Sequence, residues 1–528
     1  MRNPVYFKDW IANWGLGIRI LLFLILLSAI MQFGSFTLSQ NYIMAYLGAQ
    51  PEDISFAIQI TYVGILINVP LAFRFLRYFE MRNYLLTNMI LGIILNVCCL
   101  HTSDIYIFFI LRFFQGICIN AVCIGALIMI TGVLNPAIRQ VLGPSVFFGT
   151  VFSSTVFIGI IAANATVNSQ IINIYIYTII FQGVVLALIL CSLRAKTRFR
   201  KYPPFRIDWP GLLFYAVGGI CLAYTLLYGT KYYWFSDPRI VISSALVILS
   251  SLMFFGRQLL ATRPLIDVTV FKYKNFIAGL LVLGLYYGMK ESINILYGYT
   301  AFVLKWSPTQ TINLGLCNIL SLIFFMIITA RLLINHKKGI IPFLLVGFSM
   351  LLAYHFWVYY NLTPDLSFSD LVVPVIFQGA ASGILFVPIT VFVITSVPKS
   401  TGVAPLFLAA NTRFISLLNA NAGFYNLQIY FNQIYRESLI NHLSPEDLNA
   451  MDFLSRLTKS FLTNGLPEVS AQQAANSSLQ SVLETQSQLL ADRAIFSVIS
   501  LAIIGILLTI LMFKVLSGIV TALRKNQT

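Results

Sequence analysis

The stretch RAKTRFRKYPPFRIDWPG, residues 194–211, is the densest cluster of positive charge in the chain, with six Lys/Arg among eighteen residues. It interrupts a sequence of 528 residues in which 58% are hydrophobic and only 10% are charged. A soluble protein carries about 25% charged residues, so this chain has too little polar surface to cover a water-facing globule. The composition indicates a polytopic protein of the lipid bilayer, and the basic stretch divides its apolar segments into two groups.

Fourteen segments are candidates for membrane-spanning helices, since a helix needs roughly 20 apolar residues to cross the hydrocarbon. They are 20–47, 54–73, 84–101, 105–131, 141–163, 171–193, 210–229, 240–256, 276–303, 308–330, 340–360, 371–396, 403–428 and 494–515. The order six, two, six predicts an all-α fold in three parts. Residues 1–200 form the first six-helix bundle, 201–274 form two inserted helices with basic cytoplasmic loops, and 275–528 form the second bundle.

The sidedness of the charges tests this count. With a cytoplasmic N-terminus, 24 of the 34 Lys/Arg fall on the inner side, 7 on the outer side and 3 within spans. Positive residues resist translocation, so this asymmetry predicts an even number of spans with both termini in the cytoplasm. Most of the net charge of +16 then lies on the cytoplasmic side of the membrane, where it faces anionic lipid headgroups, and it predicts no binding of nucleic acid.

Four charged residues lie in the interior of predicted spans, away from their ends: Arg112, Lys290, Arg413 and Glu291. A charge at the centre of an inserted helix costs roughly 2.5–3.5 kcal/mol, so such residues pair or face a cavity. Lys290 and Glu291 are neighbours and project about 100° apart on a helix, which predicts that they occupy different faces. Three readings stay open. The charges form a buried ion-pair network, including a Glu291–Arg413 pair; or Glu291 carries a coupling proton; or Lys290 or Glu291 contacts substrate.

Four motifs carry a resemblance to a known family: RFFQG at 112–116, IDWPG at 207–211, RPLIDVTVFKYKNF at 263–276 and NTRFISLLNANAGF at 411–424. The chain resembles the major facilitator superfamily, in particular its fourteen-helix EmrB/QacA-type drug:proton antiporters. The resemblance implies a role in proton coupling for Arg112, whose motif includes Gln115 and Gly116. It also matches Arg413 to an arginine common in span thirteen. Arg112, Arg413 and Glu291 are the residues predicted to take part in proton coupling.

Departures from the family pattern leave an alternative open. Gln32 stands where the family has an aspartate in span one. The loop FRFLRYFEMR, residues 73–82, carries Arg77 and Glu80 where the family pattern has Asp and Gly. The paired Gly-Pro steps of span five are reduced to one, at 143–144. The alternative is an exporter of the same fold for a specific metabolite, lipid or siderophore, without proton antiport.

Amide, aromatic and cationic side chains within the spans are candidates for the lining of a substrate cavity, which suits bulky amphipathic ligands. The predicted cavity residues are Gln32, Gln115, Asn120, Tyr286, Lys290, Asn294 and Tyr297. The competing reading of each residue is interhelical packing and hydrogen bonding. The excess of positive charge within the spans favours neutral, zwitterionic or weakly acidic cargo.

The long outer segment, residues 429–492, contains a predicted amphipathic helix. Ser444, Pro445 and Asp447 have the pattern of a helix start, and Gly465 that of a helix end. The apolar positions Leu448, Met451, Leu454, Leu457 and Phe461 fall on one face. This helix either lies on the membrane or transporter surface, or binds a periplasmic adaptor that leads to an outer-membrane channel.

Other classes are not supported by the sequence. A G-x-x-x-x-G-K-[ST] phosphate-binding motif is absent, and the histidines and cysteines have no metal-ligand spacing. We therefore expect no metal, no cofactor and no enzymatic activity. The sequence predicts a secondary transporter in a bacterial inner membrane that exports amphipathic small molecules by alternating access, coupled to protons.

Overall fold

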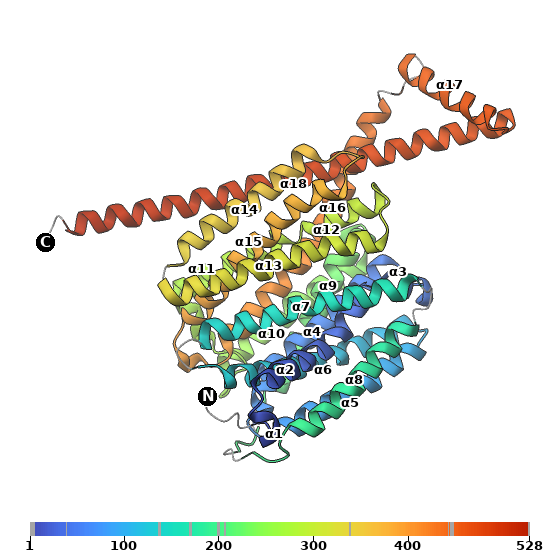
Figure 1. Ribbon diagram of the computed structural model, residues 1–528. Helices are drawn as coiled ribbons and strands as arrows, with labels where there is room; N and C mark the ends of the chain where they lie inside the picture. Colours follow the sequence, from blue (N-terminus) through green and yellow to red (C-terminus); the bar gives the residue numbers. More distant parts are fainter. Residues whose placement is uncertain are drawn as a thin grey trace. The chain divides into compact units, whose positions relative to one another are not determined.

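The computed structural model describes residues 6–38, 40–135, 139–167, 172–197, 201–204, 207–336, 339–441, 443 and 448–525. Helices account for the regular structure of these residues, and no strand is assigned within the described ranges (Figure 1). The α-helices are α1 Asp9–Ala12, α2 Gly15–Leu38, α3 Gln40–Leu47, α4 Pro51–Phe75, α5 Met81–His101, α6 Ile105–Val133, α7 Arg139–Val167, α8 Ile172–Ser192, α9 Trp209–Tyr228, α10 Pro238–Leu260, α11 Lys274–Lys290, α12 Ile293–Phe302, α13 Pro308–His336, α14 Ile340–Asn361, α15 Phe368–Thr395, α16 Ala404–Asn441, α17 Leu448–Thr463 and α18 Glu468–Lys525. Three 3₁₀ turns, η1 Trp234–Ser236, η2 Val268–Lys272 and η3 Lys399–Thr401, complete the set.

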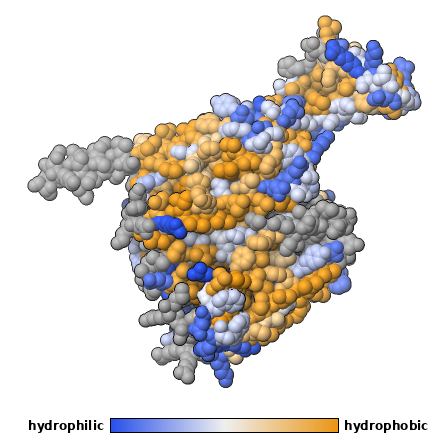
Figure 2. Space-filling view, in the orientation of Figure 1, coloured by the Kyte–Doolittle hydropathy of each residue, from blue (hydrophilic) through white to orange (hydrophobic). Residues whose placement is uncertain are grey.

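Thirteen helical segments in the described part of the chain are long and apolar enough to cross a membrane. Residues 404–428 of the predicted span 403–428 belong to α16, which is long enough but too polar to be counted among them. Figure 2 shows broad hydrophobic areas over the sides of the long helices and hydrophilic residues gathered around α17. The all-α polytopic membrane fold is confirmed, while the number fourteen and the cytoplasmic termini stay predictions.

The helices begin where the sequence supplies capping groups. Gln50 and Asp53 form a reciprocal capping box at the start of α4, with Pro51 in the first turn. The carboxylate of Asp104 accepts two backbone N–H groups at the start of α6, and Asp237 caps α10 in the same way through Arg239 N. These short polar loops satisfy the free N–H groups that every helix leaves at its start.

Contacts group the chain into two compact units. Unit 1 comprises Met1–Gly288, Ile319–Phe343 and Ser382–Asn419, and unit 2 comprises Met289–Asn318, Leu344–Ala381 and Ala420–Thr528. The predicted division at residues 200 and 274 stays a prediction.

Unit 1 is built around helices that approach closely. A Cβ added at Gly64 of α4 would lie 2.2 Å from the backbone oxygen of Phe113, and one added at Gly116 of α6 would lie 2.1 Å from that of Thr61. Small residues of this kind let membrane helices pack backbone against backbone. Aliphatic side chains of α2, α5, α6 and α8, such as Ile25, form a fully buried core beside this contact.

Glu80, a departure from the family pattern, joins two loops of unit 1. Its carboxylate accepts a hydrogen bond from Thr197 N at 3.0 Å and pairs with Lys201 Nζ at 3.2 Å. Burial raises the pKa of Glu80, but the hydrogen bonds from Thr197 and Lys201 outweigh it and hold the pKa below its ordinary value. The carboxylate is therefore ionised at neutral pH, and this tie between the α4–α5 loop and the segment after α8 is lost only in acid.

The segment 429–492 of unit 2, predicted to lie on the outer side, is largely helical in its described residues. Residues 420–441 of α16 extend toward α17, and α18 returns beside α17 (Figure 1). The predicted amphipathic helix is confirmed as α17, and the chain turns at Gly465 with φ of +86°. The predicted start residues Ser444, Pro445 and Asp447 lie outside the described residues.

Candidate functional site

The predicted ninth span is a broken helix. α11 ends at Lys290, α12 begins at Ile293, and Glu291 and Ser292 form a turn between them. The carbonyl oxygen of Lys290, freed by the break, accepts a hydrogen bond from Gln378 Nε2 at 3.0 Å. Non-helical backbone within a membrane is tolerated only where protein or water provides partners for its polar groups. The hydrogen bond from Gln378 is such a partner for this break in unit 2.

The two charges at the break pair with each other. Lys290 Nζ lies 3.0 Å from Glu291 Oε1, and Asn294 Nδ2 donates to Glu291 Oε2 at 3.1 Å. Glu291 is only 9% exposed. The prediction that Lys290 and Glu291 occupy different faces is wrong, because the helix ends at Lys290 and regular helical spacing does not apply. Of the predicted cavity residues, the structure therefore brings Lys290 and Asn294 directly to Glu291.

An amide chain holds the break to α13 and α15. Asn318 Nδ2 donates to Gln378 Oε1 at 2.6 Å and also to Val375 O at 2.9 Å. Gln378 then donates to Lys290 O. Asn318 and Gln378 are both buried, and neither was among the predicted site residues. Each is a lone amide in an apolar run, and only their spatial pairing identifies them.

His355 of α14 fixes the other side of the break. Its Nδ1 donates to Leu351 O at 2.7 Å, because a carbonyl can only accept. Its Nε2 then accepts from the hydroxyl of Ser292 at 2.9 Å. Both side chains are fully buried. His355, isolated in the sequence, is thus a positioning residue for the turn that carries Glu291.

The remaining predicted tyrosines are packed. Tyr286 is 1% exposed, and its hydroxyl donates to Ser382 O at 3.3 Å within unit 1. Tyr297 of α12 lies beside Gly315 of α13 within unit 2. Their roles in substrate binding stay predictions.

Arg112 is the centre of a polar network in unit 1. Its Nη1 donates to Gln115 Oε1 at 2.6 Å and to the backbone oxygen of Gln32 at 3.4 Å. Gln115 donates to Asn96 at 2.8 Å, and Asn96 donates to Gln182 at 3.0 Å. Asn96 and Gln182 were not predicted. The network links α2, α5, α6 and α8 through side-chain amides.

The positive charge of Arg112 has no acidic partner among the described residues. The side chain is 1% exposed, and its Nε and Nη2 have no hydrogen-bond partner there. Its guanidinium lies 4.1 Å from the centre of the Phe36 ring, a cation–π contact that stabilises the charge. Asn120, on the same helix, also has an amide nitrogen without a partner in this part of the structure. These donors can bind an acceptor group or respond to a nearby change of charge.

Arg413 of α16 also contacts aromatic rings. Its guanidinium lies 5.1 Å from the ring centre of Tyr287 and 5.9 Å from that of Phe148, all within unit 1. Glu291 belongs to unit 2, so the Glu291–Arg413 pair stays a prediction.

The structure adds a buried carboxylate to the candidate site residues. Asp492 of α18 is 1% exposed and accepts hydrogen bonds from Gln428 Nε2 at 2.8 Å and Gln488 Nε2 at 3.0 Å. The sequence reading placed it at the end of the outer segment and gave it no role. Its neutral partners on α16 and α18 provide a second place where a proton can be held.

Long apolar helices, an ion pair at a broken span and a buried arginine lacking an acidic partner in the described residues are features found in membrane transporters. The Major Facilitator Superfamily profile matches residues 21–417, and the chain belongs to this superfamily. The predicted resemblance is thereby confirmed. Membership of this superfamily indicates that the protein is a transporter rather than an enzyme.

Two curated proteins similar to this chain are multidrug export proteins. Multidrug export protein EmrB of Escherichia coli (strain K12) is 24% identical over 260 residues, covering 48% of this chain and 49% of that protein. Multidrug export protein EmrB of Haemophilus influenzae is 22% identical over 317 residues, covering 58% of each. The chain thus spans about half the length of the curated relatives it matches.

Two crystal structures show the fold over nearly the whole chain. A POT family transporter in complex with a thioalcohol-conjugated peptide has a TM-score of 0.60 at 12% identity, covering 94% of this chain and 96% of that one. The human organic anion transporter MFSD10 (TETRAN) has a TM-score of 0.53 at 11% identity, covering 92% and 98%.

Proposed function

We propose that this protein is a proton-coupled exporter of amphipathic small molecules that works by alternating access in a bacterial inner membrane. The observation that carries the proposal is the ion pair between Lys290 and the buried Glu291 at the break between α11 and α12. Discontinuous helices form substrate and ion sites in secondary transporters, and intramembrane carboxylates carry protons. The EmrB relatives support a multidrug type of cargo.

The test is transport by the purified full chain in proteoliposomes that contain a pH dye. We expect an outward-directed gradient of several unrelated amphiphiles to drive proton movement in the opposite direction. Protein-free vesicles are the control. Substrate flux without any proton movement would contradict the coupling, and flux of one compound alone would contradict the multidrug type.

A second candidate is a specific exporter without proton antiport, for a metabolite, lipid or siderophore. It is favoured by Gln32, an uncharged residue at the position where the family carries an aspartate in span one. The same vesicles distinguish the two candidates, because this one predicts a narrow cargo range and no change in the dye signal.

We also propose that α17 binds a periplasmic adaptor, which in turn meets an outer-membrane channel. Leu448 and Met451 of its apolar face are 83% and 53% exposed. The variant Leu448→Asp/Met451→Asp should lower drug tolerance of intact cells to that of a deletion strain, with unchanged flux in proteoliposomes. The control is Lys459→Asp on the same helix. Equal loss in cells and vesicles would contradict an adaptor role.

A further inference from the structure

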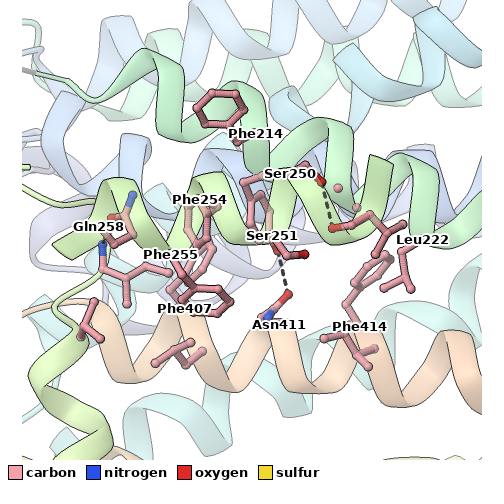
Figure 3. A pocket seen from close by; sticks show the side chains of 18 of the residues that line it. Phe214, Leu222, Ser250, Ser251, Phe254, Phe255, Gln258, Phe407, Asn411 and Phe414 are labelled. Atoms are coloured by element: carbon pink, nitrogen blue, oxygen red, sulfur yellow. Dashed lines mark hydrogen bonds between the residues drawn. The ribbon is translucent and has the colours of Figure 1, made fainter. Parts of the chain in front are cut away.

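The helices α9 and α10, which the sequence predicts as the two inserted helices, enclose a crevice against the start of α16. We call it the α9–α16 crevice, a space of about 180 Å³ lined chiefly by Phe214, Leu222, Val247, Phe254, Phe407 and Phe414 (Figure 3). All of these residues belong to unit 1. Pockets for drug-sized ligands measure roughly 300–1,000 Å³, so this one accommodates only part of such a molecule.

The crevice is lined mainly by hydrocarbon, and most of its polar atoms already have hydrogen-bond partners. Tyr215 Oη donates to Asn411 Oδ1 at 2.8 Å, which links α9 to α16 (Figure 3). Ser250 bonds to the backbone of its own helix, as Figure 3 also shows. Gln258 accepts from the backbone N–H groups of Leu265 and Ile266. These polar atoms are occupied, and the small hydroxyl of Ser251 adds little polar surface, so the part of a ligand that enters is mainly apolar.

One end of the crevice is held together by a buried carboxylate. Asp208, at the start of α9, pairs with Arg257 at 3.0 Å and accepts from Gln258 Nε2 at 3.2 Å. Arg74 of α4 donates to Pro264 O at 3.1 Å and ties the following loop down. The IDWPG and RPLIDVTVFKYKNF motifs therefore share a structural role: they fix the loop at the mouth of the crevice.

The loop 261–274 contributes Ile266, Val268 and Phe271 to the crevice lining, and this loop and the end of α10 before it combine exposed apolar and basic residues. Leu259 and Leu260 are 72% and 84% exposed. Arg263, Lys272 and Lys274 are also exposed, and Asp267 is the one acid in the loop 261–274. Apolar side chains beside a surplus of cations suit the boundary between acyl chains and anionic headgroups.

We infer that the α9–α16 crevice binds one acyl chain of an anionic phospholipid, whose headgroup is held by the basic residues of loop 261–274. The size of the crevice fits a chain segment, its lining fits hydrocarbon, and the charge at its mouth fits a phosphate. This lipid site goes beyond the proposed export function and does not depend on cargo or protons. It gives the inserted helices a role as a lipid anchor.

The test is native mass spectrometry of the purified full chain with dioleoylphosphatidylglycerol or dioleoylphosphatidylcholine. We expect the wild type to retain one phosphatidylglycerol at a concentration at least tenfold lower than phosphatidylcholine. Ser251→Trp fills the crevice and should abolish this adduct. The matched control, Leu252→Trp, changes the next residue of α10, which is 67% exposed, and should retain it.

A second variant keeps the crevice intact. Lys272→Gln/Lys274→Gln should remove the preference for phosphatidylglycerol while phosphatidylcholine binding is unchanged. A phosphatidylglycerol adduct that survives in Ser251→Trp, or a preference that survives in the lysine variant, overturns the proposal. Stoichiometric displacement of the lipid by tetraphenylphosphonium also overturns it, because the crevice would then be a cargo site.

Discussion

Replacement of Glu291 by glutamine is expected to reduce proton-coupled transport to the level of protein-free vesicles. Glutamine has nearly the same shape and can keep the contact with Asn294, but it cannot bind and release a proton. The carboxylate lies at the break between α11 and α12, next to Lys290. The measurement is the pH-dye assay described above, with substrate binding followed separately by equilibrium dialysis, which should be unchanged.

The Lys290–Glu291 pair offers a control that separates two roles of Glu291: carrying a proton, and neutralising the charge of Lys290. Glu291→Gln alone removes the carboxylate that pairs with Lys290, whose side chain is 17% exposed, so the loss of stability is expected to stay below the roughly 3–5 kcal/mol of a fully buried pair. The double variant Lys290→Met/Glu291→Gln removes both charges together. If Glu291 carries the proton, transport stays abolished in the double variant. Restored proton-coupled transport there would show that Glu291 serves only to neutralise Lys290.

The membrane fold could be predicted from sequence because hydropathy is a local property. Apolar runs of sufficient length identified thirteen of the spans that the described structure supports. The prediction for residues 403–428 has weaker support because α16 carries Asn411, Arg413 and other polar residues along its length. Their partners, such as Tyr215 for Asn411, lie far away in the chain, so hydropathy alone cannot show how they are satisfied.

The broken helix could not be predicted from sequence. Neither Glu291 nor Ser292 is a glycine or proline, so the run 276–303 has the pattern of one continuous helix. The break is held by groups from other helices: Gln378 at the carbonyl of Lys290 and His355 at Ser292. For the same reason the sequence found the charged residues of the site but not the amides and the histidine that position them.

The close contact between α4 and α6 leads to a prediction about the stability of the fold. Gly116→Ala should destabilise the folded protein by about 3 kcal/mol, the upper part of the usual range for overpacking, because the added methyl group meets backbone rather than a movable side chain. The obstructing atom is the carbonyl oxygen of Thr61, 2.1 Å from the added Cβ. The measurement is the thermal unfolding midpoint in detergent, together with the yield of monodisperse protein.

Gly183 provides a matched control, for which we expect the change in the unfolding midpoint to have the opposite sign. A Cβ added at Gly183 of α8 would meet nothing within 4 Å. Alanine is favoured over glycine inside a helix by about 1 kcal/mol, so Gly183→Ala should leave the unfolding midpoint unchanged or raise it. If both variants raise the midpoint, α4 and α6 do not pack through their backbones as the structure shows. If Gly116→Ala alone lowers it, the last residue of the RFFQG motif serves close helix packing, and the motif unites packing at Gly116 with the buried charge of Arg112 one turn away.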